Sequence, residues 1–390
     1  IAGMGVTAIL NAIMPADQAK PDNPEDFLTK ALNGANPEMM MKLKAADQQF
    51  KLDIKRLDID LEKFLSEQAG AKVTRRVLDD SKVSYDEGLW RAVADLGWLG
   101  VAIPEEYGGL GLGRLELCVL AEELGRAVAP VPFSSTVYFF AEAVMRAGGD
   151  AQKKALLPIV ASGDLIGCFA LSEGPGAPTP SSIQAKFEGG ALNGSKIPVT
   201  DGDCASHAVV VAKEGAGISL VLVDLNQAGV TRTTLKTLDP TRGHAKLEFK
   251  NAKAERLGAA GQGWELAEAV LDRAAVLIAF EQVGGSQVCL EMATDYAKSR
   301  YAFSRQIGSF QAIKHKLADM YVSIEVARSN AYYGAWALST EASELPFAAA
   351  ASRAAASDAY YLCAKENIQT HGGMGFTWDV DCHLFFRRAK

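Results

Sequence analysis

The residues best suited to binding a charged ligand lie in two stretches of the C-terminal third. In SRYAFSRQIGSFQAIKHKLADM, residues 299–320, Arg300 ends a predicted amphipathic helix and Gln311 opens the next one. An arginine fork and a glutamine amide beside the exposed ring of Phe303 can hold a pyrophosphate and stack on an adenine. The competing interpretation is that Arg300 only caps the C-terminus of a helix, which attracts cations. Spacing alone favours this capping role.

Three glycines crowd into the second stretch, QTHGGMGF, residues 369–376, directly after an alanine-rich helical run. Glycine tolerates positive φ angles and lets a ligand touch bare backbone. The pair Gly372 and Gly373 therefore either ends a helix or cradles an anionic group. One backbone geometry can do both.

The composition is that of an ordinary globular protein and argues against several kinds of partner. The chain has 390 residues, of which 48% are hydrophobic and 22% charged, and its net charge is −7. An acidic balance argues against a nucleic-acid surface. Six scattered cysteines without CxxC spacing, and histidines without ligand spacing, suggest neither a metal site nor disulfides. Reduced thiols in a cytoplasmic protein are the simplest interpretation, and the apolar first residues are too short for a membrane span.

The predicted elements run in the order helices, strands, helices, which is the α+β class. The pattern Asn36-Pro37-Glu38 starts a long amphipathic helix. Short alternating or apolar runs at 165–172, 207–213, 218–225 and 245–251 predict strands of a mostly antiparallel domain. We expect an atypical helical extension over 1–62, a helical N-terminal domain over 63–163, a middle β-domain over 164–260 and a helical bundle over 261–390. A nicotinamide-binding Rossmann domain is disfavoured because no strand–GxGxxG–helix unit is present.

Several motifs together resemble those of the acyl-CoA dehydrogenase family. The run R-x-x-F-x-R-x-I-G-x-F-Q-A-x-K-H-x-L-A-D-M and the run Q-x-x-G-G-x-G-F are similar to two family motifs. LGWLGVAIPEEYGGLGLG resembles the N-terminal domain, while ALSEGPG, LNGSKIPVTDG and AERLG resemble successive parts of the β-domain. The similarity runs in the correct order from about Leu65 to Lys390. The departures from the usual motifs resemble those of divergent bacterial members of the family, which include subunits of heteromeric enzymes.

The resemblance implies a fold and a cofactor. The middle domain would be barrel-like, and FAD would lie between it and the bundle, commonly shared with a second subunit. Arg300 would grip the pyrophosphate, with Phe303 and Gln311 near the adenosine half. Three further positions would approach that half of an FAD held mainly by the other subunit, namely Gln369, Gly372 and Gly373.

At the flavin ring, the resemblance assigns hydrogen bonds to two hydroxyls. Ser172 and Thr200 match family threonines at the isoalloxazine edge. Pro198 stands where many members place a tryptophan against the ring, so one flavin face is covered differently here.

The catalytic base is where the sequence departs most from the family. In one branch the base occupies the position of Ala274, which cannot accept a proton, and in the larger branch it lies a few residues beyond the match to Lys390. A neighbouring family arginine is matched by Ala275, although Arg273 is adjacent. Glu281 lies two turns after Ala274 and is a candidate, because buried carboxylates often mark active sites. A buried structural partner is the favoured role for it.

The implied reaction is FAD-dependent α,β-dehydrogenation of an acyl-CoA thioester, in fatty acid or steroid degradation, with electron-transferring flavoprotein as acceptor. A homo-oligomer or a heterotetramer is expected. Two alternatives stay open. One is a non-catalytic FAD-binding subunit of a heteromeric enzyme, and the other is an oxidase or monooxygenase on the same fold.

Overall fold

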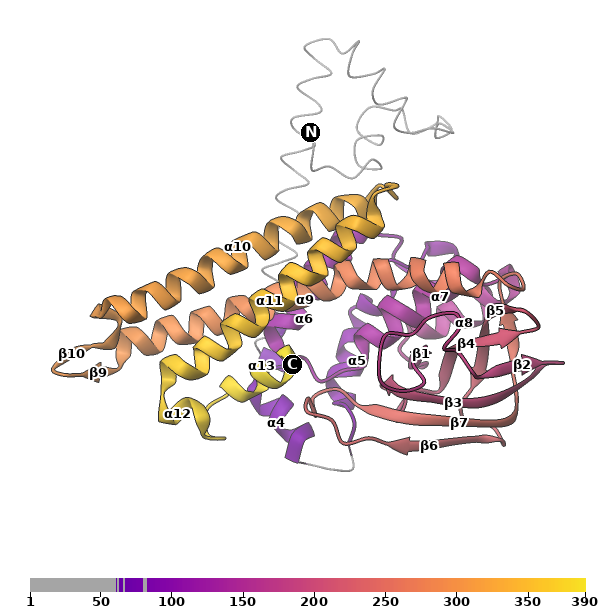
Figure 1. Ribbon diagram of the computed structural model, residues 1–390, viewed down its shortest axis with the longest axis horizontal. Coiled ribbons are helices and arrows are strands. Elements are labelled where there is room, and N and C mark those ends of the chain that lie inside the picture. The colour runs from indigo at the N-terminus through magenta and orange to yellow at the C-terminus, as the bar shows by residue number, and fades with distance from the viewer. Residues whose placement is uncertain (1–60, 62, 66, 80–82) are drawn as a thin grey trace, which may run out of the picture.

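The computed structural model describes residues 61, 63–65, 67–79 and 83–390. The extension expected over residues 1–62, with its helix start at Asn36-Pro37-Glu38, lies outside the described residues except for Leu61. Over the remainder, the predicted α+β order is confirmed: helices come first, a sheet follows, and a bundle of long helices ends the chain (Figure 1).

The N-terminal helices are short and are joined by tight turns. Asp86 starts one of them, because its carboxylate accepts a hydrogen bond from the Leu89 amide at 2.8 Å. An eight-residue π-helix runs directly into the helix that follows it. The elements are α4 (Ala71–Asp79), α5 (Glu87–Asp95), η1 (Trp98–Gly100), η2 (Glu105–Tyr107), α6 (Arg114–Ala127), η3 (Ser134–Ala141), α7 (Glu142–Ala147) and α8 (Asp150–Ala161).

The middle of the chain forms one mostly antiparallel eight-stranded sheet. Its order is β6-β7-β3-β2-β4-β5-β8, with β1 beside β4; the β1–β4 and β2–β4 pairs are parallel. The strands are β1 (Gly167–Ala170), β2 (Lys186–Glu188), β3 (Ala191–Thr200), β4 (His207–Glu214), β5 (Gly217–Asp224), β6 (Val230–Thr234), β7 (His244–Lys253) and β8 (Glu255–Leu257). The four strands predicted from alternation are present as β1, β4, β5 and β7. Strand β3 holds most of the LNGSKIPVTDG stretch and is not among the alternating runs; two register shifts accommodate its Gly194 and Pro198.

Three long helices and a hairpin make up the bundle. The hairpin joins α9 to α10 at the end of the bundle that lies away from the sheet (Figure 1). The bounds are α9 (Gly263–Ser299), β9 (Tyr301–Ala302), β10 (Arg305–Gln306), η4 (Ile307–Ser309), α10 (Gln311–Ser339), α11 (Leu345–His371), α12 (Gly373–Phe376) and α13 (Cys382–Ala389).

Helices α6 and α9 touch backbone to backbone, which fixes the N-terminal helices on the bundle. A Cβ added at Gly125 would lie 2.0 Å from the Glu281 carbonyl oxygen, and one added at Gly284 would lie 2.0 Å from that of Glu122. Only glycine allows this approach. The contact positions the middle of α9, which lines the candidate site.

Candidate functional site

A cavity of about 300 Å³ lies where the π-helix η3, the sheet and helix α9 meet. Two residues predicted at the flavin edge, Ser172 and Thr200, both line it, as does Pro198. The apolar wall comes from Phe139, Phe169, Leu171, Leu271 and Ile278. The structure therefore brings together residues from four separate stretches of the sequence, in a mostly apolar pocket with a few hydroxyl groups of the kind that binds cofactors.

The loop that carries Ser172 is held by a buried amine. Lys196 on β3 is fully buried, and its Nζ donates to the Leu171 carbonyl at 2.9 Å and to the Glu173 carboxylate at 2.7 Å. The Ile197 amide donates to the Ser172 carbonyl at 2.8 Å. Burial lowers the pKa of Lys196 to about 8, although the Glu173 carboxylate opposes the shift. These contacts fix the end of β1 against β3, so that Ser172 and Thr200 face one cavity.

Sequence reasoning missed three polar side chains of the cavity: Ser134 and Ser135 on η3, and Arg242 on the connection between β6 and β7. The Ser135 hydroxyl donates to the Asp201 carboxylate at 2.6 Å. Asp201 is only 4% exposed, and burial raises its pKa to about 6 from an ordinary 3.8, with the Ser135 hydrogen bond and Arg242 opposing the shift. The serine pair inside an apolar run was the available signal, but nothing local points to Asp201, 66 residues away.

Replacing Asp201 with asparagine should change how stability depends on pH. Because the pKa of Asp201 is higher in the folded state than in the unfolded state, the wild type is most stable below pH 4. Its free energy of unfolding falls as the pH rises through about 6. Asparagine can still accept from Ser135 and does not ionise. Relative to the wild type, Asp201→Asn should therefore gain about 3 kcal/mol between pH 4 and pH 7. Denaturant unfolding at a series of pH values measures this, and a constant difference across the series would contradict it.

The candidate base Glu281 lies outside this cavity. It is 7% exposed on α9, its carboxylate is ion-paired with the Arg242 guanidinium, and it lines a smaller cavity next to the first. Burial opposes the charge of Arg242, but the carboxylates of Glu281, Asp239 and Asp201 outweigh it and raise the pKa of Arg242. This ion pair fits the structural role that the sequence favours for Glu281.

The face of α9 towards the first cavity contributes Leu271 and Ile278 to its lining, and no acidic side chain of α9 lines it among the described residues. Ala274 is fully buried, three positions after Leu271 and four before Ile278, so it belongs to this face. Arg273 points elsewhere, with its Nε 3.3 Å from the Glu142 carboxylate. The lining of the cavity likewise includes no carboxylate within the described part of the chain.

The residues predicted to bind the adenosine half lie at the far end of the bundle. Arg300 follows the last residue of α9, and its guanidinium makes no ion pair or hydrogen bond with the rest of residues 61–390 as far as these are described. Phe303 is 92% exposed, and its ring meets that of Phe310 edge to face at 6.2 Å. Gln311 is the exposed first residue of α10. These groups are free to meet a ligand from outside the chain.

The glycine pair lies at the same end of the bundle. The ring of Tyr296, one turn before Arg300, stacks on His371 with centroids 4.2 Å apart, and His371 directly precedes Gly372. Gly372 ends α11 at φ 59° and ψ −136°, which only glycine adopts readily. Added Cβ atoms at Gly372 and Gly373 would meet nothing within 4 Å, and Gln369 is exposed beside them. Packing within the chain therefore does not require a glycine at 373, which fits a close approach by a ligand.

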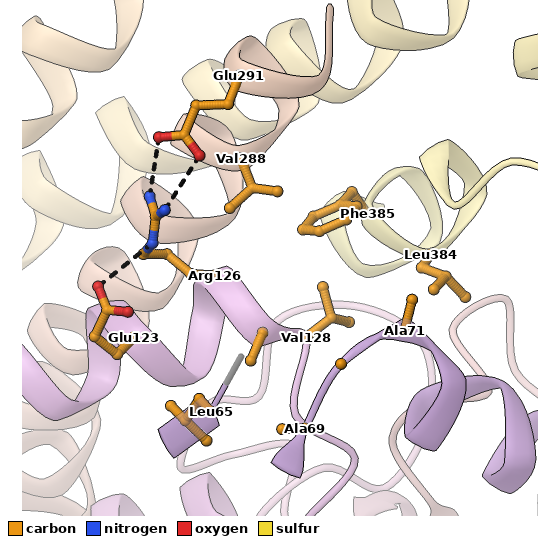
Figure 2. Close-up of a pocket in the computed structure, with 12 residues that line it drawn as sticks. Leu65, Ala69, Ala71, Glu123, Arg126, Val128, Val288, Glu291, Leu384 and Phe385 are labelled. Carbon is orange, nitrogen blue, oxygen red and sulfur yellow. Dashed lines mark hydrogen bonds and ion pairs between the residues drawn. The ribbon is translucent and has the colours of Figure 1, made fainter. Parts of the chain in front are cut away.

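A further cavity of about 330 Å³ lies between α4, α6, α9 and α13 (Figure 2). At its edge, the Arg126 guanidinium bonds Glu291 at 3.1 Å and lies 3.5 Å from Glu123. Apolar side chains such as Leu65, Val128 and Phe385 make up much of the lining. Since no sequence-predicted site residue lines it, this cavity is not a candidate for the chemistry.

The described residues include neither a candidate membrane span nor a candidate metal-binding cluster. Within residues 61–390, so far as they are described, no helix has both the length and the apolarity to cross a bilayer. The same part of the chain gathers no group of three histidine, cysteine or acidic side chains that could hold a metal ion.

Comparisons with known proteins agree with the geometry. The family model described as the N-terminal domain of acyl-CoA dehydrogenase matches residues 57–164, and the model of the C-terminal domain matches 261–390. The acyl-CoA dehydrogenase IpdE2 of Mycobacterium tuberculosis is 33% identical over 327 residues, which are 84% of this chain and 87% of that protein.

Solved structures show the same fold. Butyryl-CoA dehydrogenase from Megasphaera elsdenii superposes with a TM-score of 0.77 at 28% identity, covering 85% of this chain and 92% of that one. The ChsE4-ChsE5 complex from Mycobacterium tuberculosis gives 0.79 at 29% identity, covering 86% and 91%. With motifs, fold and relatives in agreement, this chain belongs to the acyl-CoA dehydrogenase family.

Proposed function

We propose that the chain, in complex with FAD, dehydrogenates an acyl-CoA thioester across its α–β bond. The family to which it belongs is FAD-dependent and consists of oxidoreductases. The observation that carries the proposal is the 300 Å³ cavity, in which Ser172 and Thr200 meet beside an apolar wall of α9 and η3. When bound, FAD supplies the oxidising equivalents that take up the β-hydrogen as hydride.

The residues of the chain orient the reactants and exclude water. Ser172 and Thr200 would hydrogen-bond the edge of the flavin ring, and Phe139, Leu271 and Ile278 would keep the acyl group dry, which strengthens every polar interaction there. Donors to the thioester oxygen would stabilise charge that develops as the α-proton leaves. Because the described lining has no carboxylate, the proton acceptor comes from outside it. Glu281 serves as the partner of Arg242.

The length of α9 supports an FAD site shared by two subunits. Leu271 lines the cavity at the flavin end, whereas Ser299, next to Arg300, follows it by 28 positions on one continuous helix. At about 1.5 Å per residue the two points are about 42 Å apart. One dinucleotide is too short to meet both within one chain. A second subunit, which offers its Arg300, Phe303, Gln311, Gln369, Gly372 and Gly373 to the neighbouring cavity, resolves the mismatch.

A second candidate function is a subunit that binds FAD but lacks its own proton acceptor. Ala274 and the acid-free lining favour it, and one of the solved structures with this fold is a complex of two named components, ChsE4 and ChsE5. The partner would then complete the active site.

Anaerobic titration with acyl-CoA thioesters tests both candidates. A panel of straight-chain, branched and steroid-like thioesters should bleach the flavin absorbance of a catalytic chain. Bleaching that requires an added family partner supports the second candidate. A colourless protein that takes up no FAD, alone or with such a partner, would refute both. Reoxidation of the bleached flavin by electron-transferring flavoprotein then tests that acceptor.

A further inference from the structure

A small cavity at the junction of all three parts of the fold gathers an unusual set of cations. It has a volume of about 60 Å³ and lies where α6, α9, α11, α13 and the β6–β7 connection meet. Its polar lining consists of Arg242, Glu281, Gln282, Arg353, Tyr360 and Arg388. Three guanidinium groups thus face one carboxylate.

Two of the three arginines around the cavity are in ion pairs, and the third is not. Arg242 is paired with Glu281, and the Arg388 Nε lies 2.6 Å from the Asp239 carboxylate behind it. Arg353 has no ion-pair partner among the described residues, and its Nη1 donates only to the neutral Gln282 and Ser357 side chains. The Asp201 carboxylate adds to the negative charge around Arg242, but it is hydrogen-bonded to Ser135 and makes no ion pair with Arg353. Burial and the charge of Arg242 lower the pKa of Arg353, and the Glu281 carboxylate only partly opposes this shift.

A buried hydroxyl also points to a missing acceptor. Tyr360 is 2% exposed, and its hydroxyl has no hydrogen-bond partner in the described part of the protein. Its ring is fixed, because a Cβ added at Gly285 would lie 2.5 Å from Tyr360 Cζ. Buried hydroxyls and guanidinium groups without acceptors are costly and rare. Here the donors outnumber the acceptors that the protein supplies.

We propose that this cavity binds one small monovalent anion of halide size, such as chloride, between Arg353, Arg242 and the Tyr360 hydroxyl. The anion supplies the ion-pair partner that Arg353 lacks and accepts a hydrogen bond from the Tyr360 hydroxyl. The volume is several times the roughly 10–15 Å³ that one water needs, so a chloride with an accompanying water fits. Because Arg242 and Ile278 line both this cavity and the larger one, a bound anion would also hold part of the wall of the larger cavity in place. The proposal is independent of the reaction assigned above.

Thermal unfolding of the full flavin-loaded protein tests the proposal, with chloride compared with gluconate at fixed ionic strength. A bound anion stabilises the folded state by mass action, so the midpoint should be higher in chloride by about 2 °C or more. Tyr360→Phe keeps the packing and removes only the hydroxyl; it should reduce this difference by half or more. Arg353→Gln should abolish it. Arg91→Gln, which removes an exposed ion pair to Asp164, is the matched control and should keep the full difference.

Crystals soaked in bromide locate the site. An anomalous peak between Arg353, Arg242 and Tyr360 is expected. Equal midpoints in chloride and gluconate, an unaltered difference in Tyr360→Phe, or bromide peaks only elsewhere would each overturn the proposal. Density for waters alone in the cavity would do so as well.

Discussion

Replacing Arg300 with alanine should weaken FAD binding by about 30- to 100-fold, because hydrogen bonds to charged phosphate oxygens are among the strongest that proteins make. The guanidinium has no other partner among the described residues, so its removal should leave the fold intact. The Kd for FAD, measured by fluorescence quenching, should therefore rise. The melting temperature of the FAD-free protein should stay the same.

Two matched variants sharpen the Arg300 result. Arg300→Lys keeps the charge but loses the planar fork, so we expect an intermediate loss. Lys298→Ala removes an exposed cation two positions earlier and should leave the affinity unchanged. An unchanged Kd in Arg300→Ala would favour the helix-capping role instead. So would a marked fall in the melting temperature of the FAD-free variant.

Replacing Leu271 with tryptophan should abolish the reaction with acyl-CoA while the protein still folds. Leu271 is half-buried on α9 and lines the 300 Å³ cavity, so a larger ring has space to enter it. An acyl group held even slightly out of place loses about 100-fold in rate or more. Single-turnover bleaching of the flavin by the best thioester of the panel is the measurement.

The control for this variant is Ile159→Trp, which adds the same ring at an exposed position on α8. It should keep the wild-type rate. If Leu271→Trp bleaches as fast as Ile159→Trp, the cavity is not where the acyl group reacts. If Leu271→Trp neither folds nor binds flavin, the smaller change Leu271→Phe is measured instead. Its bleaching rate should be partly reduced.

The sequence predicts the parts of the site that depend on local pattern. Helical periodicity locates α9, α10 and α11, and the turn between α9 and α10 places Arg300 and Gln311 at one tip, as observed. The glycine pair also ends α11, as its composition suggests. The assignment of Ser172 and Thr200 to the flavin edge rests on resemblance alone, because both lie at strand ends whose pairing is not visible in a single sequence.

Contacts between distant segments could not be predicted. The pairing of Ser135 with Asp201 joins a π-helix to the end of β3, and the pairing of Arg242 with Glu281 joins a strand connection to α9. In both pairs, nothing in the sequence around one residue indicates which distant residue it contacts. Alternation does not single out strand β3 for a different reason: its glycine and proline argue against a strand, and only the bulged pairing with β7 makes them acceptable.

The central claim is that Arg300 of one subunit serves the cavity of another. Complementation between two impaired variants, at an FAD concentration too low to fill the Arg300→Ala protein, tests it most directly. Arg300→Ala and Leu271→Trp carry different affinity tags and are co-expressed, and only assemblies that contain both chains are purified. If the site is shared, the cavity of the Arg300→Ala chain is served by the intact Arg300 of its neighbour. Anaerobic bleaching should then return to about half of the wild-type amount per pair. Mixed assemblies that bleach no more than either variant alone would show that each chain binds its own FAD, and would contradict the account.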